Sequence, residues 1–133
     1  MVDLQSILAE HRPLKKAASN IDNHDNRNMA EISEIPDLFF DQILVTFKLS
    51  RIEIMVLMYL YRKVWCRPNI HKEYGISPLM SHTEMAKSLG QVIEEIYNAL
   101  RRLEDYSLIS TVRSGQYFVR KYFLKENDER YLQ

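Results

Sequence analysis

The stretch SHTEMAKSLGQVIEEIYNALRRLEDYSLIS, residues 81 to 110, decides the fold of this chain. Ser81 and Glu84 have the spacing of a capping box, in which two side chains bind free backbone N–H groups at the start of a helix. This spacing predicts a compact helix over residues 82 to 88. Gly90 follows directly, and glycine commonly occupies the backbone conformation that ends a helix. We therefore expect a turn at Gly90 and a new element after it.

That new element is predicted to be a second helix, from about residue 91 to 106. Its apolar residues recur at the spacing of one buried helical face: they are Val92, Ile96, Ala99, Leu100 and Leu103. The opposite face is polar and charged, and it comprises Glu94, Glu95, Asn98, Arg101, Arg102 and Asp105. The pattern indicates a helix that packs on a core with one side and meets solvent or a partner with the other.

After Ser107 the sequence pattern changes from helix to strand. LISTV and QYFVRKYFL are rich in β-branched and aromatic residues, and a short RSG sequence with glycine separates them. Two such runs around a short turn predict a β-hairpin. The following residues, 125–133 (KENDERYLQ), are too polar to extend a core strand, and we expect a loose polar C-terminal tail.

Two helices and a strand are predicted upstream of residue 81. IPDLFFDQILVTF begins with a proline tolerated at a first helical position and continues with one apolar face. Ser50 and Glu53 then form another capping box before IMVLMYLYRKVW, whose nearly continuous apolar residues predict a central helix. GISPLM is short and contains proline, which suits one edge strand.

The N-terminal residues 1–34 differ from the rest. VDLQSILAEHR has helical apolar spacing, but a helix this short is marginal alone. KKAASNIDNHDNRNMAEISE is polar and lacks a hydrophobic period. We therefore expect a mobile segment over 1–34, either a frayed terminus or a tethered peptide that binds a partner. One folded domain is expected over 35–124.

Composition sets few limits on function. The 18 basic and 18 acidic residues cancel, although the half of the chain after Ser50 is mildly cationic. Cys66 is the only cysteine, so an internal disulfide is excluded and a reducing, cytoplasmic location is expected. The N-terminus does not have the pattern of a signal peptide, and the longest apolar stretch is too short to span a bilayer. We expect no membrane association.

No arrangement of residues in the sequence indicates catalysis. The four histidines, His11, His24, His71 and His82, lack the spacing of metal ligands, and Cys66 has no cysteine nearby. Three glycines cannot supply a phosphate-binding loop of the known glycine-rich kinds. We predict a protein without enzymatic activity, cofactor or metal.

The order of the predicted elements and two sequence stretches resemble a known family. LGQVIEEIYNALRRLEDYSLIS is similar to the stretch that links recognition helix and wing in winged helix-turn-helix proteins. IPDLFFDQILVTFKLSRIEIMVLMYLYRKVW resembles the start of the DNA-binding domain of phage replication protein O. The resemblance covers about residues 35 to 124. It implies a mainly α fold with a small β-hairpin (α+β), namely a winged helix-turn-helix with an extra N-terminal helix.

The resemblance also implies residues that contact duplex DNA. In such domains one helix enters the major groove, the helix before it crosses the backbone, and the wing reaches a nearby phosphate or the minor groove. Carried over to this sequence, the helix residues facing base edges are Gln91, Glu95, Asn98 and Arg102, with Arg101 as a further candidate. The residues facing phosphates are Ser81, His82, Thr83 and Lys87. Arg113 is the expected wing contact.

Glu94 and Glu95 leave two functions open. They depart from the basic or small polar residues usual at these positions, and carboxylates there are also explained by the helix dipole. Glu95 could instead accept a hydrogen bond from cytosine. The main hypothesis is a transcriptional regulator or origin-binding replication factor that binds double-stranded DNA. The alternative is a winged helix that binds a protein, through the N-terminal segment or the face of the recognition helix.

Overall fold

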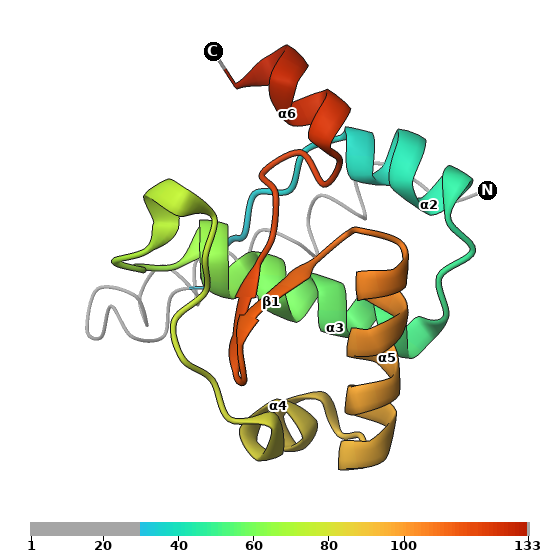
Figure 1. Cartoon of the computed structure of the whole chain (residues 1–133), viewed down its shortest axis with the longest axis vertical. Coiled ribbons are helices and arrows are strands. Elements are labelled where there is room, and N and C mark those ends of the chain that lie inside the picture. Colours follow the sequence, from blue (N-terminus) through green and yellow to red (C-terminus); the bar gives the residue numbers. More distant parts are fainter. Residues whose placement is uncertain (1–29, 133) are drawn as a thin grey trace, which may run out of the picture. The chain divides into compact units, whose positions relative to one another are not determined.

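The computed structural model describes residues 30–132. The predicted short N-terminal helix and most of the segment expected to be mobile lie outside the described residues. The chain divides into two units, Met1–Ile32 and Ser33–Gln133, and every helix and strand described here belongs to the second. This unit is mainly helical and has one small antiparallel hairpin, as the sequence predicts (Figure 1).

Helix α3 (Arg51–Tyr61) lies at the centre of this unit (Figure 1). Both bonds of the predicted capping box are present: the Ser50 backbone N–H donates to Glu53 Oε1 at 3.1 Å, and the Glu53 N–H donates to Ser50 Oγ at 3.2 Å. The helix continues into the π-helical segment η3 (Arg62–Cys66). Its buried apolar residues include Val56, Leu57, Leu60 and, in η3, Val64. The predicted central helix is therefore confirmed.

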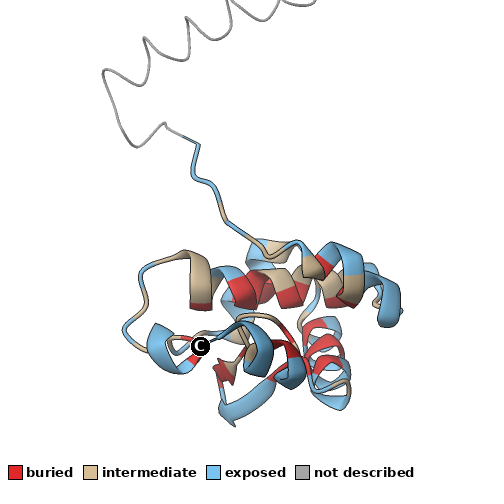
Figure 2. Cartoon of the chain, turned by 90° about the horizontal axis from the view of Figure 1, so that it is seen from above, coloured by how far each residue is buried: buried red, intermediate tan, exposed pale blue. Residues whose placement is uncertain are grey.

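The first predicted helix consists of a π-helical segment, η2 (Phe39–Ile43), and a short α-helical turn, α2 (Leu44–Thr46). Phe39 and Ile43 are buried in the core. The ring of Phe39 lies 5.3 Å from that of Phe123, near the other end of the chain. Buried residues of several elements, red in Figure 2, thus form one hydrophobic core.

The two helices of the opening stretch are α4 (His82–Leu89) and α5 (Ile93–Asp105). Gly90 ends α4 in the left-handed conformation, with φ of 65°. Four residues of the predicted apolar face are buried: Ile96, Ala99, Leu100 and Leu103. Val92 was expected on that face and is instead 58% exposed, because it caps α5 with extended backbone rather than lying within the helix.

The predicted hairpin is formed by β1 (Ser110–Arg113) and β2 (Gln116–Phe118). The second strand is shorter than QYFVRKYFL suggests. The segment expected to be an edge strand makes a single bridge, between Ile76 and Phe118, supported by a 2.8 Å bond from the Ser77 N–H to the Tyr117 carbonyl oxygen. Pro78 follows and has no N–H to donate.

The C-terminal residues correct a prediction. We expected a loose tail from residue 125, but Lys125–Tyr131 form helix α6. The buried Asn127 amide donates to Gln42 Oε1 at 2.8 Å, and Asp128 Oδ1 accepts from the Tyr122 N–H at 2.9 Å. These side-chain bonds hold a polar helix against η2 and the preceding loop, although it has little apolar surface to bury.

Between them, these elements bring α4, α5 and the hairpin to one part of the unit. A loop that contains the short 3₁₀ helix η4 (Lys72–Tyr74) joins η3 to the segment before α4. The hairpin turn packs on this segment: Met80 N–H donates to the Gly115 carbonyl oxygen at 2.7 Å. Gly115 has φ of 82°, and a Cβ there would lie 2.5 Å from the Met80 carbonyl oxygen, so only glycine fits.

Candidate nucleic-acid interface

The start of α4 presents some of the predicted phosphate contacts to solvent. Thr83 and Lys87 are exposed. Ser81 is also exposed, but its hydroxyl oxygen accepts a hydrogen bond from the Glu84 N–H at 3.2 Å, the first bond of the expected capping box. Among the described residues Glu84 does not return the second bond. Thr83 and Lys87 are therefore the side chains of α4 best placed to meet a phosphate.

His82 is directed into the protein rather than fully toward solvent. Its ring is half-buried, and Nε2 lies 2.5 Å from the hydroxyl of Tyr117 in β2. The ring also lies 4.9 Å from that of Tyr97 in α5. Burial, with smaller contributions from Glu104 and Tyr97, raises the pKa of Tyr117 and keeps its hydroxyl protonated. His82 thus joins α4, α5 and the hairpin, and one ring nitrogen is already engaged.

The outer face of α5 carries Glu95, Asn98 and Arg101, all exposed. Gln91 lies before the helix, is half-buried, and donates from Nε2 to the Leu89 carbonyl oxygen at 3.4 Å. Arg101 faces the hairpin. It lines an open hollow together with Thr111 and Ser114, which come from β1 and the hairpin turn.

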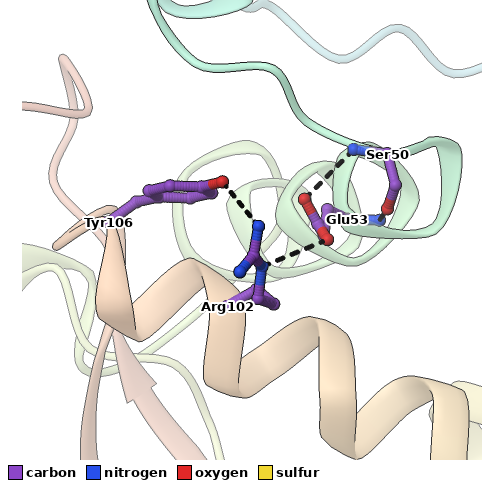
Figure 3. A network of polar contacts seen from close by, with 4 residues as sticks. All are labelled: Ser50, Glu53, Arg102 and Tyr106. Carbon is purple, nitrogen blue, oxygen red and sulfur yellow. Dashed lines mark hydrogen bonds and ion pairs between the residues drawn. The ribbon is translucent and has the colours of Figure 1, made fainter.

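Arg102, which the sequence places among the base-contacting residues, is bound within the protein (Figure 3). Its Nε lies 4.0 Å from Glu53 Oε2, and Nη2 donates to the Tyr106 hydroxyl at 3.0 Å. The guanidinium also stacks over the Tyr106 ring, 5.4 Å from its centre. Because Glu53 also binds the Ser50 N–H, one carboxylate connects the start of α3 to α5. Arg101 is therefore the freer of the two arginines.

Arg113 lies at the end of β1, directly before the hairpin turn, and it is exposed. Its Nε donates to Gln116 Oε1 at 3.1 Å. The buried Gln116 amide in turn donates to the Ser77 carbonyl oxygen at 3.1 Å. The hairpin is also tied to α5, because Glu104 Oε1 accepts from the Thr111 N–H at 2.9 Å and from its hydroxyl. The guanidinium of Arg113 is thus carried by a well-supported hairpin.

Opposite charges are mixed over this surface. Its basic residues are Lys87, Arg101, Arg102 and Arg113, and its acidic residues are Glu84, Glu94, Glu95, Glu104 and Asp105. Such a surface lacks the strong positive field that steers many proteins to nucleic acid. Contacts to DNA would therefore depend on the placement of a few cations rather than on net charge.

Sequence reasoning missed the hollow between α5 and the hairpin. Besides Arg101, Thr111 and Ser114, its lining includes His82, Tyr97, Glu104 and Tyr117. The spacing of Tyr97, Arg101 and Glu104 places them on one side of a helix, which could have indicated a shared surface. Only the fold shows that β1 lies beside that side and completes the hollow.

Comparisons with known proteins give no match: neither a protein-family model, nor a curated protein, nor a solved structure is similar to this chain. Within residues 30–132, no three His, Cys, Asp or Glu side chains are grouped so that they could hold a metal ion. No helix in the same part of the chain has the length and apolar character needed to cross a membrane.

Proposed function

We propose that this protein binds duplex DNA as a winged helix, with α5 in the major groove and the hairpin as the wing. The observation that carries the proposal is the surface shared by these two elements. Arg101 of α5 lines one open hollow with Thr111 and Ser114 of the hairpin. With a helix and a hairpin placed side by side in this way, the helix can enter a DNA groove while the hairpin contacts the neighbouring sugar-phosphate backbone.

Each element has a distinct role in this proposal. Asn98 and Arg101 meet base edges, because amide and guanidinium groups bind adenine and guanine edges through paired hydrogen bonds. Lys87 of α4 and Arg113 of the hairpin bind DNA phosphates. These contacts fix the position of α5 in the groove without specifying the DNA sequence. Arg102, held by Glu53 and Tyr106, positions α5. The protein then acts as a transcriptional regulator or as an origin-binding replication factor.

The proposal is tested by measuring the affinity for duplex DNA as a function of salt. Fluorescence anisotropy with a pool of labelled duplexes gives the dissociation constant at each salt concentration. The two cations placed at phosphates, Lys87 and Arg113, should give a slope of roughly −2 in a plot of log affinity against log salt. A flat titration at low salt would refute DNA binding.

A matched pair of variants locates the contact. Arg101→Gln should weaken binding by roughly 1–3 kcal/mol and relax the preference for one base, because it removes a base contact. Arg62→Gln removes the same charge from an exposed position at the start of η3, where the guanidinium lies over the Tyr59 ring. It should leave affinity nearly unchanged. Equal losses for both variants would mean that binding follows net charge and not the α5 surface.

One observation favours a protein partner as a second candidate. Val92 and Tyr97 are 58% and 47% exposed, and they accompany the carboxylates Glu94 and Glu95 at the start of α5. Apolar and acidic side chains together fit a basic peptide with apolar anchors. Under this alternative, Val92→Ser and Tyr97→Ser abolish capture of a protein partner, while DNA titrations stay flat for the wild type.

A further inference from the structure

The segment η2–α2 has apolar side chains on two faces. Phe39 and Ile43 point into the core, where they are 3% and 0% exposed. On the other face Phe40, Leu44 and Val45 are 54%, 37% and 75% exposed. A helix in a single globular domain normally buries one apolar stripe and presents polar residues to water. The second stripe is a candidate surface for association. We call Phe40, Leu44 and Val45 the α2 patch.

Charges flank the α2 patch in a fixed order along the chain. Asp37 and Asp41 are exposed at its N-terminal end, and Lys48 and Arg51 are exposed beyond its C-terminal end. The backbone is helical from the start of this segment, since Asp41 N–H donates to the Asp37 carbonyl oxygen at 3.1 Å. The surface is therefore acidic at one end, apolar in the middle and basic at the other.

This order is complementary to itself when two copies run antiparallel. About a twofold axis near Gln42 and Ile43, Asp37 of one copy faces Lys48 of the other and Phe40 faces Val45, while the exposed Asp41 lies against Leu44. A twofold interface requires this property, because the same patch must fit its own copy. The balanced charge fits a nucleic acid poorly, and the exposed carboxylates of Asp37 and Asp41 beside the patch disfavour a lipid surface.

The α2 patch is held in place before any partner binds. Asn127 of α6 donates to Gln42 Oε1 at 2.8 Å, and the buried Phe39 ring packs on Phe123. A surface that is already ordered loses less conformational freedom on association. Three apolar side chains cover less than the ~800 Å² per partner of a stable interface. The expected affinity is therefore modest, in the micromolar range.

We propose that two copies of this chain associate through the α2 patch in antiparallel orientation. The inference does not rest on the proposed function, because the patch shares no residue with the α5–hairpin surface. In Figure 1, α2 lies near one end of the long axis of the described unit and α4 lies at the other end.

Sedimentation velocity of the full chain tests the association. Between about 1 and 300 µM the wild type should shift from monomer to dimer. Val45→Glu should weaken dimerisation at least about tenfold, since it places a carboxylate opposite an apolar ring. Ile70→Glu is the matched control, because Ile70 is 90% exposed in the loop after η3 and should not affect dimerisation. Circular dichroism checks that both variants remain folded.

Charge reversal tests the orientation. Asp37→Lys and Lys48→Asp should each weaken the dimer, and the variant with both changes should recover most of the affinity, because the exchanged pairs meet again across the twofold axis. A wild type that stays monomeric throughout, as expected if the patch serves a different protein, overturns the proposal. A dimer that tolerates Val45→Glu also overturns it. Failure of the double reversal to recover affinity refutes the antiparallel arrangement.

Discussion

Glu53 is predicted to stabilise the protein through its hydrogen-bond acceptor more than through its charge. Its side chain is 12% exposed, accepts from the Ser50 N–H at 3.1 Å and lies 4.0 Å from Arg102 Nε. Loss of the hydrogen bond costs about 1 kcal/mol, and loss of the buried methylene groups costs about 1 kcal/mol more. The contact with Arg102 adds at most ~0.5 kcal/mol, because that side chain is 58% exposed and solvent screens the pair.

Two substitutions separate these contributions. Glu53→Ala removes all of them and should lower the free energy of unfolding by roughly 2–3 kcal/mol. Glu53→Gln keeps an acceptor oxygen and the methylene groups, and it should cost below about 1 kcal/mol. Thermal and urea denaturation followed by circular dichroism measure both, and each kcal/mol corresponds to about 4–8 °C in Tm for a domain of this size. Equal losses for the two variants would refute the reasoning.

A double-mutant cycle isolates the link between α3 and α5. Glu53→Gln combined with Arg102→Met should show a coupling of roughly 0.2–1 kcal/mol that shrinks at high salt. Arg101→Met is the control, since Arg101 has no contact with Glu53, and its coupling with Glu53→Gln should be close to zero. Zero coupling for Arg102 as well would show that the carboxylate does not hold α5.

Three further predictions concern turns, tyrosine ionisation and the α5 carboxylates. Gly115→Ala should destabilise by roughly 1–3 kcal/mol and more than Gly90→Ala, measured by thermal denaturation, because both have positive φ but only Gly115 is also in close contact with backbone. Burial raises the pKa of Tyr61. Its protonated form therefore favours the folded state, and the free energy of unfolding should fall as pH rises above about 10, less steeply in Tyr61→Phe at matched pH. Glu94→Gln and Glu95→Gln should each strengthen non-specific DNA binding in anisotropy titrations, since each removes a charge that repels phosphate. Unchanged binding would show that the start of α5 does not lie near the DNA.

Local sequence signals predicted those parts of the fold that depend on nearby residues. The capping box of Ser50 and Glu53 placed the start of α3, and the apolar spacing of α5 identified Ile96 and Leu103 as core residues. Val92 fits the same spacing, but an extended backbone at the helix start turns it to solvent. Periodicity alone cannot locate a helix boundary to one residue.

Long-range contacts explain what the sequence did not predict. Helix α6 is held by Asn127 and Asp128, whose partners lie in other segments, so its polar composition suggested a tail. Arg102 has suitable helical neighbours in the sequence, yet its carboxylate partner comes from α3. For Asn127 and for Arg102 the deciding polar group, on Gln42 or Glu53, is distant in sequence and becomes adjacent only after the core forms.

The bond from the Thr111 N–H to the Glu104 carboxylate has a consequence for self-assembly into fibrils. A backbone N–H at the outer side of β1 is a place where a strand of another molecule can add, and exposed strand edges promote aggregation in this way. Here Glu104 already occupies that donor at 2.9 Å, and its negative charge opposes an incoming carbonyl oxygen. At the other side of the sheet, Pro78 has no N–H to offer a strand of another molecule. Each margin of this small sheet therefore carries its own obstacle to a foreign strand, and removing the one at Glu104 should make the hairpin a site for cross-chain β-pairing.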